Sequence, residues 1–160
     1  MDLVKMAKAQ AELDKVICKK ANIKKPKLKD LQLALMIELG EMLNEEGSFK
    51  YWKTSHKVKK DKLIDEWADT MHFALSIMNN TGGFTKEDAK MWKELADIFS
   101  QHNTIAKLYK SIIREITISS NFIIAYLLAM GTILGFTEEE LEQAYYTKRE
   151  INFKRVYGGY

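Results

Sequence analysis

The scarcity of helix-breaking residues is the strongest constraint on the fold of this chain. Its 160 residues contain one proline, Pro26, and eight glycines. Proline interrupts a helix and glycine weakens one, whereas Lys, Glu, Leu, Ala and Met, which favour helices, are abundant here. We therefore predict an all-α fold: a helical bundle of about five to seven helices, built as a single domain over residues 1–160.

Hydrophobic periodicity places the helices in the first half of the chain. Apolar residues recur at helical spacing over 3–20, from about 31 to 47, and over 59–79. The segment around Pro26 separates the first two helices, and an aromatic-rich loop over 49–57 separates the second from the third. These segments predict three long helices.

Two capping boxes mark helix starts in the second half. In Thr85-x-x-Asp88 and Thr137-x-x-Glu140, a hydroxyl and a carboxylate have the spacing that satisfies free N–H groups in a first helical turn. We predict a helix over 86–99, one or two apolar helices within 105–134, and a last helix that begins near 138 and frays around Asn152.

Charge, cysteine content and hydropathy exclude several classes of protein. The formal net charge is only +3, and basic residues do not alternate with aromatic ones along a helix face, so no nucleic-acid partner is expected. A single cysteine, Cys18, excludes an intramolecular disulfide. The apolar segment 122–131 is shorter than the roughly twenty residues that span a bilayer, and no signal peptide opens the chain. We expect no membrane partner and a cytoplasmic location, in a bacterium or a phage-infected host cell.

Two pairs of acidic residues stand on consecutive predicted helices. Glu38 and Glu41 are three residues apart, as are Glu66 and Asp69, so each pair projects from one face of its helix. An antiparallel hairpin of these helices would bring the four carboxylates together, where they repel one another unless cations neutralise them. Mg²⁺ prefers oxygen ligands and commonly bridges carboxylates and phosphates, so the pattern favours a Mg²⁺-binding helix pair.

The surroundings of these acids strengthen that hypothesis. Acids three residues apart are common on solvated helix faces, so the spacing alone is weak evidence. Glu38, however, lies within the apolar stretch 35–39, and the segment from Glu66 to Asp69 leads into the largely apolar stretch 71–75. Burying a charge among apolar side chains is costly unless it is paired or bound to a metal. The context therefore favours a metal site over a solvated face.

With these motifs the sequence resembles the dimeric, all-α dUTP pyrophosphatases (dUTPases), within the wider all-α nucleoside triphosphate pyrophosphatase superfamily. The acidic pairs match the superfamily signature Glu-x-x-Glu followed by Glu-x-x-Asp. Further family motifs follow in order along nearly the whole chain: Gln10-x-x-Leu13-Asp14, Phe49-Lys50-x-Trp52, Asp69-x-x-His72-Phe73, and Ala144-Tyr145-x-x-Lys148-x-x-x-Asn152-x-x-Arg155 with Tyr160 at the end.

The resemblance implies a homodimeric enzyme that hydrolyses dUTP between the α- and β-phosphates. It implies two or more Mg²⁺ ions per active site, held by Glu38, Glu41, Glu66 and Asp69, with Glu38 or Glu41 as the catalytic residue that orients or deprotonates the attacking water. The remaining matched residues are expected to bind the substrate: Gln10, Asp14, Lys50, Trp52, His72, Phe73, Tyr145, Lys148, Asn152, Arg155 and Tyr160.

The chemistry of these side chains suits such roles. The amide of Gln10 can both donate and accept hydrogen bonds, as the edge of uracil requires. Trp52 and Phe73 offer flat apolar surfaces to a base or deoxyribose. Lys148 and Arg155 lie about two helical turns apart and offer cationic donors to phosphate oxygens.

Two alternatives stay open at this stage. The first is an all-α pyrophosphatase with relaxed pyrimidine specificity, acting on dUDP or dCTP as well as dUTP. The second is a helical interaction or regulatory protein that uses the apolar segment 122–131 and its basic flanks to bind a partner. Both classes can hold together, so a regulatory protein partner is also an open prediction.

Overall fold

The computed structural model describes residues 1–55, 57–118 and 121–158, which form seven α-helices and no strand. The predicted all-α class is confirmed. In chain order the helices are α1 (Leu3–Lys20), α2 (Leu28–Glu46), α3 (Lys60–Asn80), α4 (Lys86–His102), α5 (Ile105–Ile118), α6 (Ile123–Ile133) and α7 (Glu138–Gly158).

Local sequence signals account for several helix ends. Gly47 ends α2 in the left-handed conformation, with φ of 71°, where a side chain would be strained. The Thr85 hydroxyl accepts a hydrogen bond from the backbone N–H of Asp88, whose carboxylate accepts one from the backbone of Thr85. Thr137 and Glu140 make the same reciprocal pair at the start of α7. Both predicted capping boxes are confirmed.

The last helix differs from its prediction. α7 does not fray around Asn152 but continues to Gly158. Its last turns are held by ring stacking of Phe153 on Tyr157 and by the guanidinium of Arg149, 4.7 Å from the centre of the Phe153 ring. The backbone oxygen of Val156 also accepts a hydrogen bond from Lys20 of α1. Contacts between successive turns of α7, together with one hydrogen bond from α1, thus stabilise a segment that the sequence predicts to fray.

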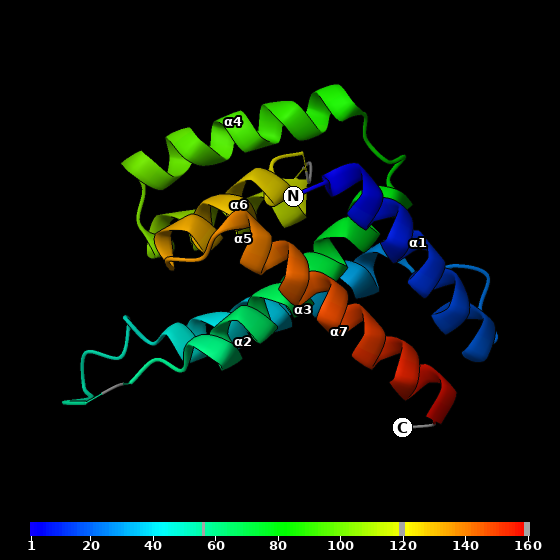
Figure 1. The fold of residues 1–160 in the computed structure, drawn as a ribbon, viewed down its shortest axis with the longest axis horizontal. Helices are drawn as coiled ribbons and strands as arrows, with labels where there is room; N and C mark the ends of the chain where they lie inside the picture. Colours follow the sequence, from blue (N-terminus) through cyan, green and yellow to red (C-terminus); the bar gives the residue numbers. More distant parts are fainter. Residues whose placement is uncertain (56, 119–120, 159–160) are drawn as a thin grey trace.

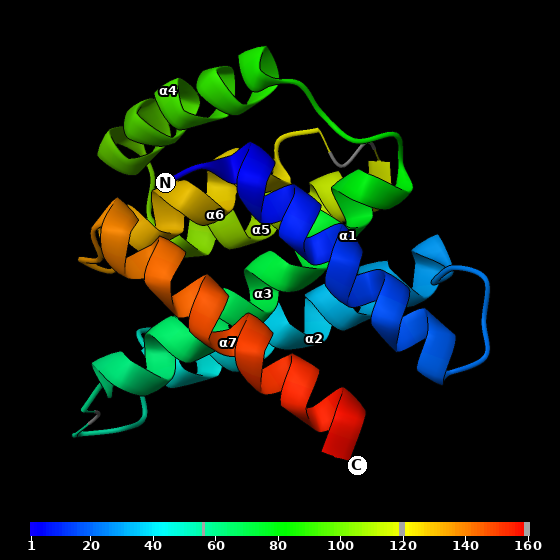
Figure 2. The ribbon, with the colours of Figure 1, turned by 45° about the vertical axis from the view of Figure 1, so that its right-hand side comes forward.

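The helices form layers around α3. α2 packs along α3, with the connecting loop extending beyond the bundle (Figure 1). α5 and α6 pack together, and α4 covers α6 from outside. α1 and α7 contact each other and α3, and they run side by side in both views (Figure 2). Helix α3 therefore lies at the centre of the bundle and contacts α1, α2, α6 and α7.

The apolar segment 122–131 is covered by its own chain. Residues 123–131 are buried except Tyr126, which is half-buried. The indole N–H of Trp67 on α3 donates to the backbone oxygen of Leu127, and a Cβ at Gly131 would lie 2.6 Å from a methyl carbon of Leu141. The segment is thus a core helix that packs closely on its neighbours, not a free docking surface. Among the described residues, no helix is long and apolar enough to cross a membrane.

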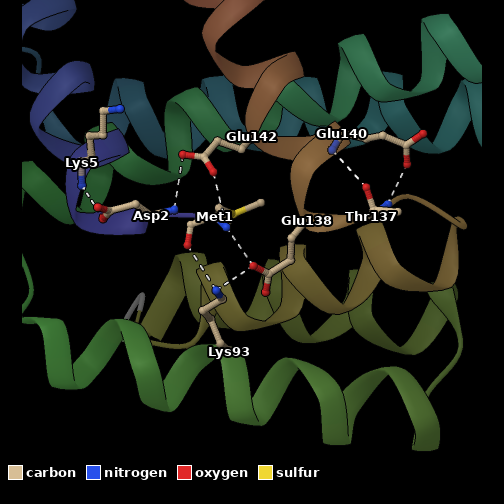
Figure 3. A network of polar contacts seen from close by, with 8 residues as sticks. All are labelled: Met1, Asp2, Lys5, Lys93, Thr137, Glu138, Glu140 and Glu142. Carbon is tan, nitrogen blue, oxygen red and sulfur yellow. Dashed lines mark hydrogen bonds and ion pairs between the residues drawn. The ribbon is translucent and has the colours of Figure 1, made fainter.

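The start of α7 is tied to α1 and α4 by ion pairs (Figure 3). The amine of Met1 lies 3.0 Å from a carboxylate oxygen of Glu138 and 3.4 Å from one of Glu142. Lys93 of α4 contacts the same Glu138 carboxylate at 2.7 Å and donates to the backbone oxygen of Met1. Together with the contact between Lys20 and Val156, these bonds hold α7 in place across α1 and α3.

Candidate active site

Three of the four predicted metal ligands converge between α2 and α3. Glu38, Glu66 and Asp69 each offer a carboxylate oxygen, and these oxygens all lie within 4.8 Å of one another. All three side chains are half-buried. Glu41, one turn along α2 from Glu38, is exposed and does not join this group, although its charge acts on both Glu38 and Glu66. The helix hairpin predicted from the spacing thus brings together oxygen ligands of the kind Mg²⁺ prefers.

The close approach of these acids raises their pKa values. Burial, together with the charges of Asp69, Glu41 and Glu66, raises the pKa of Glu38 to about 7. Burial and the charges of Glu41 and Asp69 also raise the pKa of Glu66. Burial raises the pKa of Asp69 as well, although Lys148 opposes this shift. The carboxylate group, by which we mean the cluster of Glu38, Glu66 and Asp69, therefore holds more negative charge than its surroundings neutralise. A bound cation would relieve the repulsion among the three side chains.

Lys148 is the cation nearest to this group. Its ammonium nitrogen lies 2.6 Å from an oxygen of Asp69 and 2.8 Å from one of Asp65. The side chain of Lys148 is only 6% exposed, so its stem is enclosed between α3 and α7. Burial alone would lower the pKa of Lys148, but the hydrogen bonds that its ammonium donates to these two carboxylates outweigh burial and raise this pKa, so the group stays charged.

Four of the predicted substrate-binding residues form a second cluster next to the first. The amide nitrogen of Gln10 donates to Asp14 at 2.8 Å and to Ser76 at 3.0 Å. Its amide oxygen accepts from the hydroxyl of Tyr145 at 3.1 Å and lies 2.5 Å from Nδ1 of His72. The amide of Gln10 is 3% exposed and fully engaged, so its orientation is fixed by the network.

His72 is held as a neutral ring inside this cluster. Its ring stacks on that of Tyr145, with centroids 4.3 Å apart, and its Nε2 lies 3.2 Å from the backbone oxygen of Tyr145. Burial lowers the pKa of His72 to about 4. Nδ1 faces the Gln10 oxygen and Nε2 faces the backbone oxygen of Tyr145, and the neutral ring has one proton to donate to one of these two acceptors.

The whole chain matches one family of enzymes. A family model described as dUTPase aligns with residues 2–160. The chain belongs to the dUTPase family. It is accordingly a hydrolase of nucleotide metabolism, a dUTP diphosphatase whose substrate is dUTP.

The aromatic loop of this dUTPase family member lies apart from the carboxylates. Trp52 is 59% exposed and contacts the rings of Phe49 and Tyr51 edge-on. The ammonium of Lys50 donates to the backbone oxygen of Asn44 at 2.5 Å. Within the described part of the chain, neither Lys50 nor Trp52 hydrogen-bonds or ion-pairs with Glu38, and their predicted contacts with substrate stay predictions.

The C-terminal motif is distributed along α7. Tyr145 belongs to the buried Gln10 cluster, and Lys148 to the carboxylate group one turn later. Asn152 is half-buried, and Arg155 is exposed, although its charge acts on Asp69. Phe73 on α3 is half-buried and packs against the core. The predicted residue Tyr160 lies outside the described residues.

Asp65 is a charged neighbour of this site that the sequence motifs do not include. It precedes Glu66 of the family signature and shares Lys148 with Asp69. One signal for it does exist: Asp61, Asp65 and Asp69 recur at four-residue spacing, which places them in a row along one helix face. Its partner on α7 could not be predicted, because Lys148 lies 83 positions away along the chain.

Proposed function

We propose that this dUTPase family member hydrolyses dUTP to dUMP and pyrophosphate in a Mg²⁺-dependent reaction at Glu38, Glu66 and Asp69. The observation that supports this most directly is the convergence of three carboxylate oxygens within 4.8 Å from two different helices. The donor set fits Mg²⁺, because it consists of oxygen atoms alone and has an excess of negative charge. Glu41 is one turn away and would complete the set after a change of rotamer.

The residues of the site would then have separate roles in the hydrolysis. Bound Mg²⁺ would neutralise phosphate oxygens and acidify a water molecule. Glu38 would orient the attacking water or accept its proton, since its carboxylate lies among the oxygens that would hold the metal. The water oxygen would form a bond to the α-phosphorus, the bond from that phosphorus to the bridging oxygen would break, and pyrophosphate would leave. Lys148 and Arg155 would stabilise the charge on the departing phosphates.

Selectivity for uracil would come from the Gln10 cluster. His72 follows Asp69 by three residues on α3, so the cluster lies about 4–5 Å further along the helix axis than the carboxylates. Such an arrangement suits a nucleotide whose phosphates meet the metal ligands and whose nucleoside extends toward Gln10 and His72. Four groups already surround the Gln10 amide, so it would have to exchange at least one of these partners for the edge of uracil when the nucleotide binds.

We also propose that the chain acts as a homodimer. Leu33 and Ile37 lie one turn apart on α2, the helix that bears Glu38, and are 59% and 52% exposed. Large apolar side chains repeated on one helix face are typical of a covered surface. Sedimentation equilibrium would test this proposal, with L33E/I37E expected to shift the mass from two chains toward one.

Pyrophosphate release across nucleotides tests the proposed reaction. Purified chain with Mg²⁺ should release pyrophosphate from dUTP faster than from dCTP or dTTP, and EDTA should abolish the release. Similar rates of nucleoside monophosphate formation from dUTP, dUDP and dCTP would favour the relaxed pyrimidine enzyme; dUDP would release phosphate in place of pyrophosphate. Equal rates on purine nucleotides would overturn the uracil assignment, and full activity in EDTA would overturn the metal dependence.

A further inference from the structure

The ammonium of Lys148 lies between two carboxylates, only one of which belongs to the proposed metal ligands. Asp69 contacts it at 2.6 Å and Asp65 at 2.8 Å. The two acids are four residues apart on α3, so they stand one above the other on the same helix face. Asp65 is 47% exposed, whereas Lys148 is 6% exposed. A single buried cation is thus shared by an inner and an outer carboxylate.

We infer that Asp65 is a positioning residue, which retains Lys148 at the edge of the site when Asp69 binds Mg²⁺. This inference rests on the proposed function. When the Asp69 carboxylate is committed to Mg²⁺, it attracts the Lys148 ammonium less, and the cation itself repels that ammonium. Asp65 is already within hydrogen-bonding distance, so Lys148 keeps a charged partner after a small displacement of its end group.

Burial of the Lys148 stem makes this second partner necessary. The side chain is enclosed between α3 and α7, so its ammonium cannot turn out into solvent without leaving its packing. A buried charge without a partner is strongly unfavourable. If Asp65 were absent, Lys148 would stay on Asp69 and compete with Mg²⁺ for the same oxygens. Asp65 therefore lowers the cost of metal binding through Lys148, although it is not itself a ligand.

Magnesium binding without nucleotide tests this role. The apparent Kd for Mg²⁺ would be measured by calorimetric titration or by the rise of Tm for the full chain and its variants. Asp65→Asn should raise that Kd about three- to fivefold, the scale expected for a partly exposed ion pair. Asp65→Glu, which restores an acceptor, should recover most of the loss. Lys148→Gln should lower the Kd, because it removes the competing cation.

A matched control separates this role from the loss of a nearby negative charge. Asp61 is exposed and stands one turn before Asp65 on the same face, so Asp61→Asn removes equal charge without touching Lys148. We expect Asp61→Asn to change the Kd by less than about twofold, as for a screened surface charge. In the Lys148→Gln background, Asp65→Asn should have no larger effect than Asp61→Asn.

The outcomes distinguish this inference from the function on which it rests. An Asp65→Asn variant that binds Mg²⁺ as tightly as Asp61→Asn overturns the role of Asp65. A loss of Mg²⁺ affinity in Asp65→Asn that persists in full in the Lys148→Gln background also overturns it. If Lys148→Gln does not fold, a failure of Asp65→Glu to recover Mg²⁺ binding overturns the role of Asp65. A wild-type chain that binds no Mg²⁺ overturns the inference together with the metal site. If the variants bind Mg²⁺ as expected but the wild-type chain releases no pyrophosphate from dUTP, the proposed reaction is contradicted and the role of Asp65 is not.

Discussion

Two polar clusters lie one turn apart along α3 and α7, the first shared with α2 and the second with α1, yet they differ in how their charges and hydrogen bonds are satisfied. In the carboxylate group, Asp69 meets Lys148, while Glu38 and Glu66 repel each other at close range. One turn further along α3 and α7, His72 stacks on Tyr145 within the cluster around Gln10. The first cluster has too few positive charges, whereas every polar atom of the Gln10 amide in the second has a partner.

This difference separates a cluster that needs a cation from one whose hydrogen bonds are already made within the chain. A group of acids with raised pKa values is unfavourable by itself and persists only where the surrounding fold over-determines it, as is common at functional sites. A satisfied buried network holds its members rigidly and defines where the adjacent helices cross. We expect removal of a charge from the first cluster to affect catalysis but not folding, and disruption of the second to affect folding first.

The largest expected effect is on catalysis at the carboxylate group. Glu66→Gln should reduce pyrophosphate release from dUTP by about 100- to 1,000-fold, the scale seen when a group that stabilises transition-state charge is lost. In metal-free buffer the Tm of this variant should equal or exceed that of wild type, because like-charge repulsion is relieved.

Asp61→Asn is the control for this prediction, because it removes an exposed charge from the same helix and should keep near-normal turnover. A Glu66→Gln variant with normal turnover, or one that unfolds more readily than wild type, would remove the contrast between the two clusters.

A smaller effect, on stability, is expected for Gln10→Ala. The substitution leaves the buried groups of Ser76, His72 and Tyr145 with fewer partners, and should lower the free energy of unfolding by about 2–4 kcal/mol. Urea unfolding in metal-free buffer would measure this loss. Lys8→Ala, on the exposed face of the same helix, should change stability by less than about 0.5 kcal/mol. Equal stability of the two variants would show that the network does not support the fold.

The smallest effect is a difference in pH dependence between the two clusters. In the metal-free fold the pKa of Glu38 is raised from 4.5 to about 7. Its contribution to the free energy of unfolding is therefore fully present below pH 4.5 and is lost as the pH rises toward about 7. The pKa of His72 is lowered to about 4 from 6.5, so its contribution is present above pH 6.5 and is lost as pH falls toward 4. Each contribution should be on the order of 1 kcal/mol after allowance for solvent screening.

Variants separate the two contributions. With EDTA present, the stability of Glu38→Gln relative to wild type should increase as pH rises from about 4.5 to about 7. The stability of His72→Asn relative to wild type should increase as pH falls from 6.5 to about 4, on top of a constant loss from broken hydrogen bonds. Parallel pH curves for wild type and Glu38→Gln would mean that the carboxylates do not repel one another in the folded chain.

The sequence by itself determined the helices and the centre of the site. The capping pairs at Thr85 and Thr137 satisfy backbone groups only a few residues away, so they act before any tertiary contact forms. Spacing of three residues placed Glu66 beside Asp69 for the same local reason. The convergence of Glu38 with both then required only that α2 and α3 pack as a hairpin, which their connection by a single loop favours.

Only the tertiary structure decided the partners of these residues. Lys148 meets Asp65 and Asp69 because α7 crosses α3 at that turn, a relation between segments 83 and 79 positions apart that no local pattern encodes. The same crossing encloses the Gln10 amide, and a hydrogen bond from Lys20 of α1 joins contacts within α7 in keeping that helix intact through Gly158. Local hydrogen bonds fix where helices begin, whereas the pairing of charges depends on how whole helices pack.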